Sequence, residues 1–313
     1  MNMKEMTENM RYRTFIPIFL LSIVAVSHSC SEWTSTEPVR VGTVFPWEQN
    51  PADWQEYMAA IRDYKGRNHY LTYVRFENSP ESVPNERGFM RCLPDSLDIV
   101  SLTNAGNFSG YDAEDMEWMH SMGTRVLYQL DFAGKPEMLY DEALLATALD
   151  RAISTVKDNG LDGFSFTGLP RDDGGVTATL SSSIIGRLSD VAGADGLLVF
   201  EGNPAFIGAE DIAKIDFFVL ATENLENSYD LRNSVQDARD MGIGNDRIIL
   251  AAALSGTFKD IDNVEQNVLE AMSDHVVSEG PLAGLALYGI EDDYYHYDGN
   301  WLTVRSAISR LNP

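Results

Sequence analysis

Cysteine is scarce in this sequence. The 313 residues contain only 2 cysteines, Cys30 near the N-terminus and Cys92 ahead of a strand-like run. Because we assign Cys30 to a lipid anchor below, Cys92 has no partner for an intramolecular disulfide, and the fold must be held by its apolar core. We therefore interpret Cys92 as a buried structural thiol rather than a nucleophile.

Positive charge is also scarce. The chain has 23 Lys and Arg against 48 Asp and Glu, a formal net charge of −25. Such a surface repels nucleic acid and anionic lipid headgroups, whereas neutral sugars are compatible with it. The apolar fraction of 44% is that of a globular protein and excludes a disordered acidic chain.

No hydrophobic run is long enough to cross a bilayer. The apolar segment from Phe15 to Val26 is too short for a stable spanning helix but typical of a signal-peptide core. Lys4, Arg11 and Arg13 precede it, and small residues lead directly to Cys30. This arrangement is similar to a lipobox, although Ser27 stands where Leu or Val is usual. A plain secretory signal with a chance cysteine is the alternative.

The sequence thus predicts an exported protein in three parts. Residues 1–29 are expected to be a lipoprotein signal peptide, residues 30–38 a polar tether, and residues 39–313 a single folded domain. Cys30 would carry the lipid anchor, placing the domain at the outer membrane, on the cell surface or in the periplasm. No repeat, charge block or low-complexity linker indicates a second domain.

Short β-rich runs alternate with amphipathic stretches along this domain. Several runs are nearly continuous in Val, Ile, Leu and aromatic residues, as parallel strands buried on both faces should be. The eight runs are His69–Glu77, Leu97–Asn104, Arg125–Phe132, Leu161–Thr167, Gly196–Glu201, Asp216–Ala221, Arg247–Leu254 and Ala283–Ile290. Eight strands with interleaved helices predict a closed (β/α)8 TIM barrel. A doubly wound open sheet is the alternative, but no G-x-G-x-x-G loop follows any run.

The working residues of a β/α barrel stand at the C-terminal ends of its strands. The fourth run carries the most informative residues, in the segment from Leu161 to Pro170. It resembles the signature of glycoside hydrolase family 18, L-D-G-[FIV]-D-[FI]-D-x-E-P. The frame is kept, including Asp162, but Ser165 and Thr167 replace two aspartates and Leu169 replaces the catalytic glutamate.

Other segments resemble the same family, in particular its endo-β-N-acetylglucosaminidase-like lipoproteins from Bacteroidetes. These segments are residues 57–69, which look like the family's first helix, and residues 93–102 and 123–127, which are similar to its second and third strands. The resemblance extends from about residue 50 to the end of the chain. It implies a barrel that recognises glycans containing N-acetylglucosamine.

The replaced residues are those that carry the family's chemistry. There the substrate's acetamido oxygen attacks the anomeric carbon, a glutamic acid protonates the leaving oxygen, and an aspartate orients the acetamido group. Leu169 has no proton to give, and Thr167 cannot stabilise positive charge. The family's tyrosine after strand six is also missing, because the first tyrosine that follows the sixth run is Tyr229. We therefore expect no catalytic residues, and no metal or cofactor.

Binding needs only shape, stacking and hydrogen bonds, and suitable residues follow several strands. Aromatic rings stack on the apolar faces of sugars, and carboxylates accept hydroxyl protons. The candidates are Asp131, Phe132, Glu201, Glu223, Glu291, Tyr294 and Tyr295. Any one of these acids could instead be a solvated loop charge. Tyr294 and Tyr295 are adjacent, so at most one of them should face a sugar.

The sequence therefore predicts a catalytically degenerate, glycan-binding lipoprotein. Its partners would be a glycan, the membrane lipid at Cys30 and, as further candidates, glycan-uptake proteins. Two alternatives stay open. One is an active glycosidase in which Glu201 and Glu223 are relocated catalytic acids, for which a separation of roughly 5–9 Å would be required. The other is a structural or assembly lipoprotein without affinity for sugar.

Overall fold

A computed structural model describes residues 46–78 and 85–313 of the chain. The predicted signal peptide, Cys30 and the tether lie outside the described residues. The chain divides into two units, with described residues 46–54 in the first and 55–78 and 85–313 in the second. In the described part of the first unit, α2 (Pro46–Gln49) precedes the start of α3 (Pro51–Gly66), and the rings of Trp47 and Trp54 lie 5.8 Å apart.

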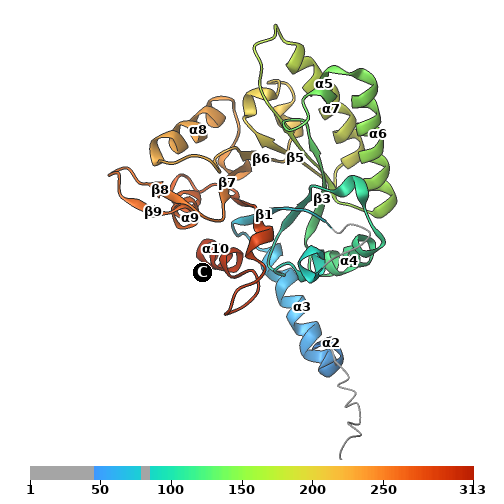
Figure 1. Ribbon diagram of the computed structural model, residues 1–313, viewed down its shortest axis with the longest axis vertical. Helices are drawn as coiled ribbons and strands as arrows, with labels where there is room; N and C mark the ends of the chain where they lie inside the picture. The colour runs from blue at the N-terminus through green and yellow to red at the C-terminus, as the bar shows by residue number, and fades with distance from the viewer. Residues whose placement is uncertain (1–45, 79–84) are drawn as a thin grey trace, which may run out of the picture. The chain divides into compact units, whose positions relative to one another are not determined.

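The second unit is built on eight parallel strands that close into a barrel (Figure 1). The barrel strands are β1 (Leu71–Phe76), β2 (Ile99–Leu102), β3 (Arg125–Asp131), β4 (Gly163–Gly168), β5 (Leu197–Gly202), β6 (Phe217–Leu220), β7 (Ile248–Ala253) and β10 (Gly284–Tyr288). Each predicted run corresponds to one of these strands. Six strands lie within their runs, and β4 and β5 each end one residue beyond theirs. Neighbours in the chain are neighbours in the barrel, and β10 closes it against β1. This confirms the predicted TIM barrel and excludes the open sheet.

Helices and short turns connect the strands. The α-helices are α4 (Gly110–Ser121), α5 (Glu137–Tyr140), α6 (Glu142–Asn159), α7 (Val176–Ala192), α8 (Ser228–Asp240), α9 (Val268–Ser278) and α10 (Leu302–Leu311). The 3-10 helices are η1 (Glu86–Gly88), η2 (Met90–Cys92), η3 (Ala105–Asn107), η4 (Pro204–Phe206), η5 (Ile212–Lys214), η6 (Asn245–Arg247) and η7 (Ile290–Asp293). An antiparallel hairpin of β8 (Thr257–Lys259) and β9 (Glu265–Asn267), which the sequence pattern did not predict, follows β7. No helix in the described part of the chain has the length and apolarity of a membrane span.

Two separate apolar clusters hold the barrel. The smaller cluster fills its interior and includes Tyr73, Leu127, Val199 and Ile249. The larger one packs the outward faces of the strands against the helices. Alternate residues of one strand belong to different clusters because side chains of a strand point to opposite faces in turn. This two-sided burial explains the nearly continuous apolar runs in the sequence.

Helix α6 illustrates how local sequence sets the element boundaries. Asp141 caps its start by accepting hydrogen bonds from the N–H groups of Ala143 and Leu144, both at 3.0 Å. Gly160 ends it in the left-handed conformation with φ 68°. In the following signature, Gly163 has φ +140°, and a Cβ added there would lie 2.0 Å from the carbonyl oxygen of Leu197. The signature glycine is therefore required by close strand packing.

Three aspartates have the same role at the N-terminal end of the barrel. They stand immediately before β2, β4 and β6. Each carboxylate accepts a hydrogen bond from a backbone N–H of the neighbouring strand: Asp98 from Thr72, Asp162 from Val126 and Asp216 from Leu198, all at 2.8 Å. The N–H of each aspartate donates to the carbonyl of that same residue. We call these three residues the aspartate clamps.

Ala283 occupies the fourth equivalent place, before β10. Its N–H donates to the carbonyl of Ile248 in the same way, at 2.8 Å. A carboxylate is not needed here because the N–H of Ile248, the residue that follows η6, already donates to the carbonyl of Asn245. Asp162 of the family signature is thus a structural residue that joins β3 to β4.

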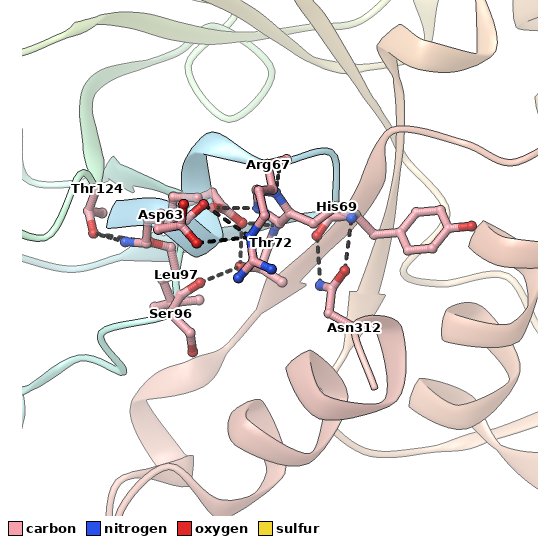
Figure 2. Close-up of polar contacts among 11 residues, drawn as sticks. Asp63, Arg67, His69, Thr72, Ser96, Leu97, Thr124 and Asn312 are labelled. Carbon is pink, nitrogen blue, oxygen red and sulfur yellow. Dashed lines mark hydrogen bonds and ion pairs between the residues drawn. The ribbon is translucent and has the colours of Figure 1, made fainter. Parts of the chain in front are cut away.

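Further polar contacts close this end of the barrel (Figure 2). Lys65 donates to the carbonyl of Leu97 at 2.5 Å and to Oγ1 of Thr124 at 2.6 Å. The two ring nitrogens of His69 lie 2.8 Å from the carbonyl of Arg67 and 2.9 Å from Oδ1 of Asp98. Two acceptors are satisfied only by the doubly protonated ring. The hydrogen bond to Asp98 accordingly raises the pKa of His69, against the opposing effect of burial.

Candidate functional site

Glu201 lies at the centre of the C-terminal end of the barrel, where β5 ends. It is only 2% exposed. Its Oε1 accepts hydrogen bonds from the hydroxyl of Tyr73 at 2.7 Å and from Nε2 of Gln129 at 2.8 Å. Its Oε2 accepts from Nε of Arg75 at 2.7 Å and from the hydroxyl of Tyr288 at 2.8 Å. The hydroxyl of Ser101 also donates to Oε1, at 3.4 Å. Donors from β1, β2, β3 and β10 thus converge on one carboxylate, and we call this group the Glu201 network.

The network keeps Glu201 ionised. Burial acts to raise the pKa of Glu201, but the charge of Arg75 and the hydrogen bonds from its neighbours hold it below its usual value. Burial and the adjacent carboxylate raise the pKa values of Tyr73 and Tyr288 well above the ordinary range, so both hydroxyls remain donors. The guanidinium carbon of Arg75 also lies 3.8 Å from the centre of the Tyr288 ring. An ionised carboxylate that accepts from five donors has no proton to release, which argues against Glu201 as a relocated acid.

The three replaced signature positions lie side by side at this end of β4. Ser165 is fully buried, with its Oγ 2.6 Å from Oγ of Ser101. Thr167 donates to Oδ1 of Asp131 at 2.8 Å and accepts from the N–H of Ala133 at 2.9 Å. Leu169 is 53% exposed. Asp162, the one signature aspartate that the chain keeps, lies at the opposite end of the barrel.

The other predicted binding residues differ in accessibility. Asp131 is exposed at the end of β3, and Glu291 is partly exposed in η7. Glu223, after β6, is partly buried, and its Oε2 has no hydrogen-bond partner among the described residues. Phe132 was expected to offer a stacking ring, but it is fully buried in the outer apolar cluster and offers no exposed face.

The two adjacent tyrosines after β10 point in different directions. Tyr294 is 4% exposed, and its ring packs edge-on against Trp301 with centroids 5.2 Å apart. Its ring is therefore not accessible for stacking on a sugar. Tyr295 is 61% exposed and rests edge-on against Tyr294 at 4.6 Å. Cys92, whose pKa is raised by burial, lies beneath this group, and its carbonyl accepts a hydrogen bond from Trp301 at 2.6 Å.

Sequence reasoning missed most of the Glu201 network. The available signal was a polar residue at an inward position of an otherwise apolar strand: Arg75 in Leu71–Phe76 and Gln129 in Arg125–Asp131. A charge in such a place is costly unless it is paired, so its presence indicates a buried partner. No group of acids, histidines and cysteines that could hold a metal ion occurs in the described ranges 46–78 and 85–313.

Comparison with known proteins finds a family model that matches part of the chain and solved structures that share its fold. The family model described as glycoside hydrolase family 18, BT1044-like, matches residues 34–149. A selenomethionine variant of BT1044 has a TM-score of 0.68 at 18% identity, covering 85% of this chain and 95% of its own.

An endo-β-N-acetylglucosaminidase from Cordyceps militaris has a similar fold. Its apo structure has a TM-score of 0.62 at 18% identity, covering 82% of this chain and 96% of its own. A mutant of that enzyme in complex with fucosyl-N-acetylglucosamine-Asn gives 0.60 at 17% identity, with coverages of 82% and 95%. No curated protein matches the sequence.

Proposed function

From the premise that this chain is a glycoside hydrolase family 18-like barrel, we propose that it binds a glycan containing N-acetylglucosamine without cleaving it. The site is the C-terminal mouth of the barrel, around the end of β4. The choice of ligand is supported by the similar enzyme that holds fucosyl-N-acetylglucosamine-Asn. The observation that carries the proposal is the row Ser165, Thr167 and Leu169, which has no carboxylate.

Loss of cleavage follows from the chemistry of these side chains. A positioned general acid typically contributes a factor of about 10²–10⁴ in rate. Leu169 cannot supply a proton, and the hydroxyl of Thr167 is already donated to Asp131. The nearby carboxylate of Glu201 is fully hydrogen-bonded and ionised. Hydrolysis by the family's route therefore has neither its acid nor its assisting carboxylate.

The mouth retains groups suited to binding. Tyr295 offers an exposed ring for stacking, while Asp131 and Glu291 offer carboxylate oxygens to sugar hydroxyls. We expect Tyr295→Ala to weaken glycan binding at least tenfold, since loss of an aromatic anchor often costs about 2 kcal/mol. Calorimetric titration measures the change. Tyr229→Ala, which removes a ring that is 75% exposed on α8, is the matched control. Equal affinities for both variants would place stacking elsewhere.

A single experiment tests binding and cleavage together. The purified full-length protein is titrated with fucosyl-N-acetylglucosamine-Asn and with chitotetraose, and each mixture is then analysed by mass spectrometry for products. Saturable binding with intact ligand is expected. Product formed above the buffer control would contradict the proposal.

One observation supports the alternative of hydrolysis by a relocated acid. Oε2 of Glu223 is enclosed and has no partner among the described residues, so this carboxylate is not committed in the way that Glu201 is. Glu223→Gln preserves shape and removes the acid. Turnover that disappears in this variant would establish the hydrolase alternative, whereas absence of any sugar affinity would favour the assembly lipoprotein.

We also propose that the protein is lipid-anchored through Cys30 at the outer membrane. The support is the order of basic, apolar and small residues that ends at this cysteine. Cys30→Ala should abolish acyl labelling and release the protein from the membrane fraction. Membrane association that persists without an acyl label would refute the anchor.

A further inference from the structure

A serine, a histidine and a glutamate meet on the outer side of the barrel, where α8, α9 and the hairpin of β8 and β9 come together (Figure 1). Oγ of Ser228, the first residue of α8, lies 3.2 Å from Nε2 of His275 in α9. Nδ1 of His275 lies 3.5 Å from Oε1 of Glu279, the residue that follows α9. A hydroxyl, an imidazole and a carboxylate in this order can act as a nucleophile, its general base and the group that orients the base.

The imidazole of His275 has the properties of a general base. Burial lowers the pKa of His275, so the ring is neutral at pH 7. Nε of Arg232 donates to Oε1 of Glu279 at 2.7 Å and holds this carboxylate beside Nδ1. The carboxylate favours the tautomer with its proton on Nδ1, which leaves Nε2 as an acceptor for the hydroxyl of Ser228. The carbonyl of Lys259 is a second acceptor for this hydroxyl, at 3.2 Å, but only Nε2 can take up its proton.

The contact between His275 and Glu279 is loose in the free protein. At 3.5 Å it exceeds the roughly 2.7–3.2 Å of an N–H···O hydrogen bond, and Nδ1 is buried without a hydrogen-bond partner among the described residues. Buried polar atoms without a partner are rare in native proteins, and each needs an explanation. Hydrogen bonds between catalytic groups are often long before substrate binds and shorten in the complex. A bond that forms during function accounts for this unpaired nitrogen.

A hollow of about 210 Å³ gives access to the serine and the histidine, which both line it. Ser228 is only 3% exposed, so the hollow is the approach to its hydroxyl. Phe258, Ile261 and Ala271 supply apolar groups to the lining. The volume is below the range of roughly 300–1,000 Å³ typical of small-molecule sites. The hollow therefore has room for a short acyl group but not for a long acyl chain.

The charges of the lining select a neutral substrate. Arg232 is paired with Glu279, and Asp274 is paired with Arg310 at 2.8 Å. Asp260, in contrast, accepts hydrogen bonds from uncharged N–H groups. The balance left in the hollow is therefore negative, and it disfavours a substrate that carries a negative charge of its own.

The start of α8 supplies donors for a developing negative charge. Asn227 caps this helix, and its side chain accepts from the N–H of Asp230 at 3.0 Å. The N–H groups of Ser228 and Tyr229 belong to the first turn, where a helix offers no backbone acceptor. Such N–H groups stabilise an oxyanion, and here they belong to the serine itself and to the next residue. The nucleophile and the donors thus come from one helix end, and the base comes from the neighbouring helix.

We propose that Ser228, His275 and Glu279 form a second site, which hydrolyses neutral esters of short carboxylic acids. Oγ of Ser228 attacks the carbonyl carbon while its proton moves to Nε2 of His275. The ester C–O bond then breaks, and the leaving alcohol takes the proton from Nε2. A water molecule attacks the acylated serine in the same way, with His275 taking a proton from the water and returning it to Oγ, so that the carboxylic acid is released. This activity does not depend on glycan binding at the barrel mouth.

The first test uses the wild-type protein, so it does not depend on the folding of a variant. The full-length protein is treated with a small fluorophosphonate, which phosphonylates an activated serine with loss of fluoride, and the modified residue is identified by peptide mass spectrometry. Labelling of Ser228 is expected. Ser278, an exposed serine that lines the same hollow, is the internal control and should stay unlabelled. An unlabelled Ser228, or equal labelling of both serines, would overturn the proposal.

The second test measures turnover of p-nitrophenyl acetate and p-nitrophenyl octanoate. The wild type should hydrolyse the acetate at least tenfold faster. Ser228→Ala and His275→Gln should each lower kcat for the acetate by about 100-fold or more. Glu279→Gln should lower kcat roughly tenfold or more with KM unchanged, as expected of a positioning residue. Ser278→Ala is the matched control and should hydrolyse the acetate at the wild-type rate. Hydrolysis that persists in a folded Ser228→Ala variant, or that favours the octanoate, would refute the site.

Discussion

The two ends of the barrel use carboxylates in different ways. At the N-terminal end, each aspartate clamp joins two neighbouring strands through a backbone N–H, and the three clamps act separately. At the C-terminal end, one glutamate accepts hydrogen bonds from side chains of β1, β2, β3 and β10, as far as 128 residues away in the chain. The first arrangement needs only a local sequence pattern, whereas the second requires the closed barrel.

The difference explains which parts of the family signature survive in β4. Asp162 and Gly163 support strand pairing at the N-terminal end, and both are kept. Ser165, Thr167 and Leu169 lie toward the mouth, where the family resemblance places its chemistry, and none of the three carries a carboxylate. One strand thus keeps the signature residues that hold the fold and has other residues at the positions to which the resemblance assigns catalysis.

The largest effect should follow from breaking the Glu201 network. Arg75→Met leaves the carboxylate of Glu201 buried without its countercharge, and removal of one partner of a buried pair typically costs about 3–5 kcal/mol. We expect a loss of that size in the free energy of unfolding, measured by urea denaturation. The control is Arg125→Met, whose partner is clamp Asp162 and whose side chain is 50% exposed. This change should cost less than about 1 kcal/mol, and equal losses would contradict the comparison.

Restoring the family's carboxylates should destabilise the mouth rather than revive catalysis. Ser165→Asp would bury a second negative charge close to Glu201, since Ser101 contacts both Oγ of Ser165 and Oε1 of Glu201, the latter at 3.4 Å. We expect the triple variant Ser165→Asp, Thr167→Asp and Leu169→Glu to lose more than about 2 kcal/mol of unfolding free energy. It should show little or no hydrolysis of chitotetraose by product analysis. A stable and active triple variant would show that only these three positions had decayed.

Removing one clamp should have a moderate effect. Asp162→Ala leaves the N–H of Val126 without its charged acceptor, and hydrogen bonds to charged groups contribute about 1.5–3 kcal/mol. Urea denaturation should therefore show a loss near 2 kcal/mol. At the mouth, Ser165→Ala removes a hydrogen bond between two neutral hydroxyls and should cost about 1 kcal/mol. The reverse ranking would mean that the signature aspartate does not stabilise β3 and β4.

The smallest effect concerns pH. The pKa of His69 is raised above 6.5 by its hydrogen bond to Asp98, so its contribution to stability is complete below about pH 6.5 and disappears as pH rises through the folded value. Burial lowers the pKa of His275 below 6.5, which gives the opposite dependence, a loss as pH falls below about 6.5. Unfolding free energies measured from pH 5 to 8 should change slope in opposite directions for His69→Gln and His275→Gln. Slopes that change in the same direction would disprove this assignment.

Much of the fold could be predicted from local sequence. Apolar runs buried on both faces indicated all eight strands, because a parallel barrel strand needs apolar residues on both sides. The adjacent pair Tyr294 and Tyr295 was expected to divide between inside and outside, and the structure shows one ring buried and the other exposed. The absence of carboxylates at positions 165, 167 and 169 could likewise be seen from the sequence itself.

Only the tertiary structure decided which polar groups meet. Glu201 is visible in the sequence as an acid at a strand end, but its donors come from strands that are distant in the chain and face it only when β10 closes the barrel against β1. Phe132 directly follows a strand in the sequence, yet its ring packs into the outer apolar cluster. The guanidinium of Arg151 meets the carbonyl of Gly106, 45 residues away in the chain, only because α6 packs against η3. Local patterns determine strands and caps because those depend on near neighbours; the accessibility and ionisation of a site depend on contacts between distant segments.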